Sequence, residues 1–196
     1  MFGVVSTRFG LMVPHGKLEK CIDFLEEGLR SIKRTPYHGV LGKDFLRQTD
    51  DLAGFLVDFC KKANTEKLKL AAIYLEMNGF TINPDQWYCD MFGYKKAGDV
   101  WELDWLSSSD METNPYQCFV LKGMESVQEV FAELFLDNKQ PLGVKLAEEI
   151  AEHLVTARFM QLVAASHKAA RRRYSGLKGL QVLATAHDWD TVHQTM

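Results

Sequence analysis

The sequence predicts an α+β fold in which a small antiparallel or mixed sheet packs against several helices, one of them long and central. Three observations support this. Apolar stripes at helical spacing dominate the first third of the chain, strand-like alternation begins only after Pro84, and one wide apolar helical pattern fills residues 143–173. Because helices and strands are grouped rather than alternating, the order does not fit repeated βαβ units.

The first part of the chain is expected to be helical. Helices are predicted over residues 17–33 and 51–62, where apolar side chains recur every three or four residues. In the first of these helices the stripe consists of Leu18, Cys21, Ile22, Leu25, Leu29 and Ile32. A third helix is predicted over residues 66–77, although the dense apolar run within it is also compatible with a strand.

The second part of the chain supplies the sheet and the central helix. A strand is predicted at residues 86–94, with a second one, antiparallel to it, at Tyr116–Leu121. A helix over 126–135 precedes the long helix over 143–173, whose wide apolar face indicates a central position. A final strand is expected at residues 180–186. On the first strand, alternation separates Trp87, Cys89 and Met91 from Tyr88, Asp90, Phe92 and Tyr94.

Composition points to one globular domain over residues 1–196. Hydrophobic residues make up 46% of the 196 residues and charged residues 25%, and no Gly-, Ser- or Pro-rich linker divides the chain. No apolar run approaches the length of a membrane span, and the N-terminus lacks the pattern of a signal peptide. The four cysteines form no CxxC pair, so we expect four free thiols and a cytoplasmic location.

Charge disfavours nucleic acid as the main partner. The net charge is −3 and the pI about 6.1, whereas dedicated nucleic-acid binders are usually basic. One basic run, at residues 168–178, is the exception. It suits either phosphate contacts or a solvated helix end that interacts with its own dipole. The sequence contains no G-x-S-x-G motif and no glycine-rich phosphate loop.

An acidic segment with interleaved tryptophans is the main candidate for a partner-binding surface. It is far longer than a simple connection between two strands needs to be, and it contains no basic residue. Aromatic side chains supply binding area and carboxylates steer a basic partner. The alternative is that the aromatic residues cover the core while the acids face water. The candidate residues are Asp99, Trp101, Glu102, Asp104, Trp105, Asp110 and Glu112.

A cluster of histidine and aspartate near the C-terminus is the candidate metal site. His187, Asp190 and His193 are each three residues apart, so on a helix they would share one face. Imidazole and carboxylate groups suit zinc, iron or manganese. The alternative is a polar, frayed chain end.

These observations favour a non-catalytic protein that binds another protein, with a basic surface on the partner. An inhibitor or an immunity-type protein, which neutralises its partner, has this size and acidity. No cofactor is expected on this interpretation. The alternative function is a small metal-binding protein or metal-dependent enzyme that uses the C-terminal cluster.

Overall fold

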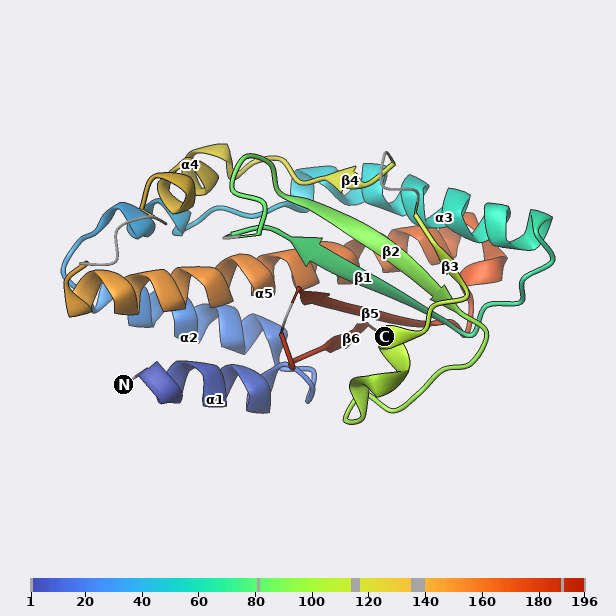
Figure 1. The fold of residues 1–196 in the computed structure, drawn as a ribbon, viewed down its shortest axis with the longest axis horizontal. Helices are drawn as coiled ribbons and strands as arrows, with labels where there is room; N and C mark the ends of the chain where they lie inside the picture. The colour runs from blue at the N-terminus through green and yellow to red at the C-terminus, as the bar shows by residue number, and fades with distance from the viewer. Residues whose placement is uncertain (1, 81, 114–116, 135–139, 188, 196) are drawn as a thin grey trace.

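A six-stranded mixed sheet and five α-helices make up the described part of the chain, which in this computed structural model comprises residues 2–80, 82–113, 117–134, 140–187 and 189–195 (Figure 1). The helices are α1 (Phe2–Met12), α2 (Leu18–Arg30), α3 (Thr49–Thr65), α4 (Glu125–Leu134) and α5 (Leu142–Arg173). The strands are β1 (Ala72–Asn78), β2 (Tyr88–Tyr94), β3 (Met111–Glu112), β4 (Phe119–Val120), β5 (Gln181–Ala186) and β6 (His193–Thr195).

The strands follow the order β3-β2-β1-β5-β6, and β4 also pairs with β2. The central strand β1 is antiparallel to β2, with Leu75 opposite Met91, and parallel to β5, with Ile73 opposite Val182. All other pairings are antiparallel. The predicted α+β class and mixed sheet are therefore confirmed.

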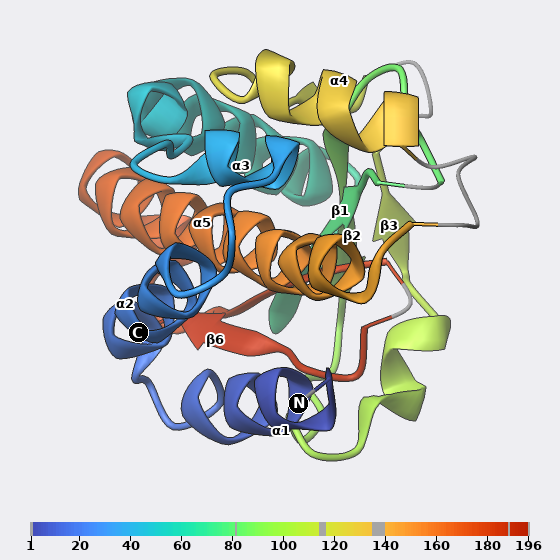
Figure 2. The ribbon, with the colours of Figure 1, turned by 90° about the vertical axis from the view of Figure 1, so that its left-hand side faces the viewer.

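Helix α5 occupies the centre of the molecule, as the sequence predicted. No residue between Ile150 and Val163 is exposed, so over almost four turns the helix is covered on every side. Figure 2 shows the reason: α3 lies above α5, α2 lies below it, and the sheet covers a third side. This packing partly buries the charges of Arg158 on α5 and Glu26 on α2. The two side chains compensate each other by forming an ion pair of 2.7 Å.

The helix predicted over residues 66–77 is wrong, because the second half of this range forms strand β1 and the first half is not helical. Helix α3 continues to Thr65, Lys67 then takes a left-handed conformation with φ 60°, and the chain becomes extended. Six of the seven residues of β1 are buried, because α5 covers one face and other side chains cover the second. A strand buried on both faces loses its alternation, so its dense apolar run resembles a buried helix.

The remaining elements confirm most of the sequence predictions. Strand β2 places Cys89 and Met91 in the main core, and β5 and α4 begin within one residue of the expected positions. The strand predicted at Tyr116–Leu121 is present as the shorter β4, while Tyr116 itself lies outside the described residues. Helix α1 and strands β3 and β6 were not predicted.

All four cysteines are free, as expected: Cys21, Cys60 and Cys89 are buried and Cys118 is half-buried. Burial raises the pKa of the Cys21 thiol to about 12 and that of the Cys60 thiol to about 11, so neither is reactive. Within the described ranges, no helix combines the length and apolar character that crossing a membrane requires.

Replacing Leu25 by alanine tests the packing of α2 on the core. Leu25 is 1% exposed, so Leu25→Ala is expected to lower the free energy of unfolding by about 2–5 kcal/mol through lost burial and a cavity. Leu11, on α1, is 60% exposed, and Leu11→Ala is expected to change the free energy of unfolding by less than about 0.5 kcal/mol. Urea unfolding measures both. Equal effects of the two substitutions would contradict the placement of α2.

Candidate functional site

The acidic segment crosses the face of the sheet that points away from α5, here called the outer face. Figure 2 shows this segment, in yellow-green, on the side of the sheet opposite the helices. It includes a short 3-10 helix, η3 (Leu103–Ser107). A second, smaller apolar cluster forms where the segment meets the sheet. Its members are Ala72, Tyr74, Phe92, Tyr94, Val100, Leu103, Trp105, Leu106, Leu183 and Val192.

Trp105 anchors the segment to the sheet. Its indole packs edge-on against the ring of Tyr94, with 4.9 Å between ring centroids, and its Nε1 donates a hydrogen bond of 3.0 Å to the carbonyl oxygen of Asp99. The Tyr94 hydroxyl in turn donates a hydrogen bond of 2.8 Å to the carbonyl oxygen of Leu106. The indole leaves no room for a Cβ at position 98, which explains the glycine there. Of the two tryptophans in the segment, Trp105 therefore covers the core.

Two of the acidic residues accept hydrogen bonds from backbone N–H groups in or next to the segment. Asp110 accepts a hydrogen bond of 2.8 Å from the backbone N–H of Lys95 and forms an ion pair of 2.7 Å with its ammonium group, which together lower the pKa of this carboxyl. Asp99 accepts a hydrogen bond of 2.9 Å from the backbone N–H of Trp101. Glu112 is exposed on the short edge strand β3. These carboxylates contribute to local structure or lie at the sheet edge.

The side chains of Trp101, Glu102 and Asp104 face solvent and, unlike those of Asp99 and Asp110, accept no hydrogen bond from the backbone of the described residues. Trp101 is 62% exposed, and its ring is 5.7 Å from the ring of His15. Glu102 and Asp104 are exposed, and among the described residues neither carboxylate has a hydrogen-bond or ion-pair partner. We call these three residues the Trp101 surface. The segment thus covers the core with one side and presents an aromatic ring and two free charges on the other.

The proposed metal ligands His187, Asp190 and His193 are not brought together. His187 lies just beyond β5, and its Nδ1 is 2.6 Å from Oε1 of Glu76 on the outer face. His193 pairs with Ala184 in the sheet and is buried on the opposite face, and burial lowers its pKa. Asp190 is exposed in the connection between them. In the part of the chain that is described, no three His, Cys, Asp or Glu side chains are placed to hold a metal ion.

A row of polar side chains on the outer face was missed by sequence reasoning. Glu76 accepts a hydrogen bond of 2.9 Å from the Tyr74 hydroxyl in addition to its contact with His187. Asp90 accepts hydrogen bonds of 3.1 Å from Asn78 and 3.2 Å from Thr113, while burial raises its pKa. Alternation in β2 placed Asp90 on this face, but its partners Asn78 and Thr113 lie 12 and 23 residues away in the sequence.

A pocket of about 250 Å³ lies where the parallel strands β1 and β5 end. Its walls include Met77, Phe80, Trp189, His187 and Glu152, the last from the middle of α5. Phe80 has a φ of 53°, a conformation that a non-glycine residue adopts only under strain. Burial, followed by repulsion from two nearby glutamates of α5, raises the pKa of Glu152 to about 7. The signal available in the sequence was a glutamate within the long helix whose apolar face is wide.

Comparison of the chain with protein-family models, with curated proteins and with solved structures finds no match. The interpretation of these surfaces therefore depends on their geometry and chemistry alone.

Glu152 makes the stability of the protein depend on pH in a predictable direction. Its pKa is about 7 when folded and near the ordinary value of 4.5 when unfolded, so the folded state holds a proton that the unfolded state releases. The contribution of Glu152 to stability therefore falls as pH rises from about 5 to 8. The variant Glu152→Gln lacks this titration, and the wild type is expected to lose about 1–3 kcal/mol relative to it over this range. Urea unfolding at both pH values measures the difference. A difference that does not change with pH would contradict the buried carboxyl.

Proposed function

We propose that the chain is a non-catalytic binding module for another protein, and that the Trp101 surface contacts a basic region of that partner. The observation that carries this proposal is the 62% exposure of Trp101 in a segment whose neighbouring residue Trp105 is packed into the core. Tryptophan is enriched among the residues that dominate binding energy, and the exposed ring of Trp101 is available to a partner.

Anchoring of the segment supports the proposal, because it lowers the entropic cost of binding. Trp105, Leu103 and Leu106 pack on the outer face, and Asp110 pairs with Lys95 at the segment's end. The backbone around Trp101 is therefore ordered before a partner arrives, so less conformational freedom is lost on association.

Charge supports a basic partner. Glu102 and Asp104 flank the exposed ring and have no cation beside them within the described ranges. Unpaired carboxylates at the rim of an interface attract a positively charged partner and raise the association rate. Inhibitors and immunity-type proteins neutralise their partners by binding to them through a surface of this kind. Four free thiols suit a reducing compartment, so we infer that binding takes place in the cytosol.

Substitution of Trp101 tests the surface directly. The wild-type chain and the Trp101→Ala variant are immobilised side by side and exposed to lysate of the native host, and a basic protein retained by the wild type alone is purified. Loss of the ring is expected to weaken its binding by about thirtyfold or more, which corresponds to about 2 kcal/mol. The melting temperature is expected to stay unchanged because the ring is exposed. Equal binding to both chains would contradict the proposal.

Neutralising the two carboxylates tests the charge argument. Glu102→Gln with Asp104→Asn is expected to slow association several-fold at low salt, and the difference should shrink as salt is raised. The matched control, Glu129→Gln with Glu133→Gln, changes net charge equally at two exposed positions on α4. If the control slowed association as much as the surface variant, the effect would belong to net charge and the assigned surface would be wrong.

A further inference from the structure

The C-terminal end of α5 carries a concentration of positive charge that the proposed function does not use. Lys168, Arg171 and Arg172 follow one another at helical spacings of three and four residues, which places them on one face. Together with Lys178 they line a hollow of about 550 Å³, here called the basic hollow. All four side chains are exposed, and in the described part of the chain none forms an ion pair with a carboxylate.

The helix dipole does not account for this arrangement. Cations in the last turn of a helix interact favourably with its C-terminal carbonyl groups, and this effect reaches Arg171 and Arg172. Lys178, however, lies beyond the helix, and the 3-10 turn η4 (Ser175–Leu177) brings the chain back so that Lys178 faces the same hollow. Cations that converge from two elements repel one another unless an anion lies between them.

Arg173 shows what a structural cation at this helix end does instead. It follows Arg172 directly but points to another side of α5, where it forms an ion pair of 2.5 Å with Asp50 at the start of α3. Arg173, which joins α5 to α3, is thus neutralised, whereas the four cations of the basic hollow have no carboxylate partner within the described residues. The positive field also reaches the helix interior: the pKa of His167 is lowered by burial and then by Arg171.

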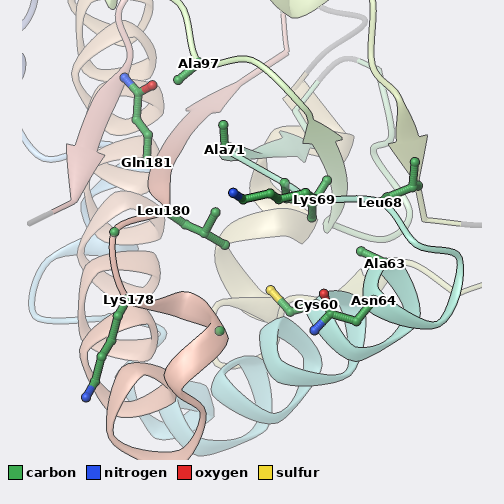
Figure 3. A pocket seen from close by; sticks show the side chains of 13 residues that line it. Cys60, Ala63, Asn64, Leu68, Lys69, Ala71, Ala97, Lys178, Leu180 and Gln181 are labelled. Carbon is green, nitrogen blue, oxygen red and sulfur yellow. The ribbon is translucent and has the colours of Figure 1, made fainter.

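A second pocket adjoins the basic hollow and differs from it in chemistry. It has a volume of about 480 Å³, lies at the start of β1 and β5, and shares Lys178 with the hollow. Its walls are mixed: Leu68, Leu180 and Cys60 are apolar, whereas Gln181 and other side chains offer polar groups. Figure 3 shows the ammonium group of Lys69 pointing into this pocket toward Leu180, and Lys178 pointing away from it.

The geometry points to one binding site for a small organic polyphosphate, with the phosphates in the basic hollow and an uncharged body, such as a nucleoside, in the adjoining pocket. Arginine and lysine bind phosphate oxygens through charge-assisted hydrogen bonds, and both volumes are within the range of ligand pockets. A nucleic acid fits less well, because the protein carries a net charge of −3 and, among the described residues, no aromatic side chain lines the hollow for bases to stack on.

Equilibrium dialysis with labelled adenosine triphosphate, at about 50 mM salt and without magnesium, tests the site. The nucleotide is expected to bind, and inorganic tripolyphosphate is expected to displace it with several-fold weaker affinity, because it lacks the body that fills the second pocket. Absence of binding at about 5 mM nucleotide would overturn the proposal. So would equal affinity for the two compounds, or displacement by a single-stranded oligonucleotide far below the concentration of tripolyphosphate that is needed.

A pair of variants assigns the binding to the basic hollow. Arg171→Gln with Arg172→Gln removes two phosphate contacts and is expected to weaken nucleotide binding by about tenfold or more. Arg173→Gln, the matched control on the same helix turn, removes one cation outside the hollow and is expected to change affinity by less than about twofold. Circular dichroism verifies that both variants are folded. An equal loss in both would show a non-specific charge effect and overturn the assignment. The site shares no residue with the Trp101 surface, so each proposal can fail without the other.

Discussion

Burial of α5 on all sides is the constraint on which the rest of the structure depends. A helix without an exposed residue from Ile150 to Val163 needs a covering element in every direction, and α2, α3 and the sheet supply them. This arrangement leaves the outer face of the sheet without a helix. Tyr74, Tyr94 and Leu183 lie on that face and require another cover, which the acidic segment provides through its apolar side chains. The candidate protein-binding surface is a consequence of this second cover.

The same helix also determines where the remaining chemistry lies. About a third of the way along α5, Glu152 reaches the pocket at the ends of the parallel strands β1 and β5. At the end of α5, Arg171 and Arg172 line the basic hollow, and the turn that follows leads directly into β5. One element thus places an acidic pocket and a basic hollow at opposite ends of the parallel strand pair. Glu152 lies within the enclosed stretch of α5, whereas Arg171 and Arg172 lie in its exposed last turn.

Sequence reasoning succeeded where a pattern is local and one-sided. The stripe of α2 from Leu18 to Leu29 and the alternation of β2 were predicted because each element buries one face. It failed at β1, where burial on both faces removes the alternation, and at β6, whose three residues are held by pairing with β5 rather than by any local preference. For the candidate site, too, only part of the arrangement could be predicted from the sequence. Composition identified the acidic segment, but only packing separates half-buried Trp105 from exposed Trp101, and Glu76 meets His187 across 111 residues of sequence.

Hydrogen–deuterium exchange of the free chain and of the chain bound to its captured partner tests the central claim most directly. The account predicts slow exchange at the anchored backbone near Trp105 in both states, and a decrease in exchange on binding that is concentrated around Trp101, Glu102 and Asp104. Exchange in α5 should not change, because this helix is already buried in the free protein. Protection that develops elsewhere, with residues 99–106 exchanging equally fast in both states, would contradict the account.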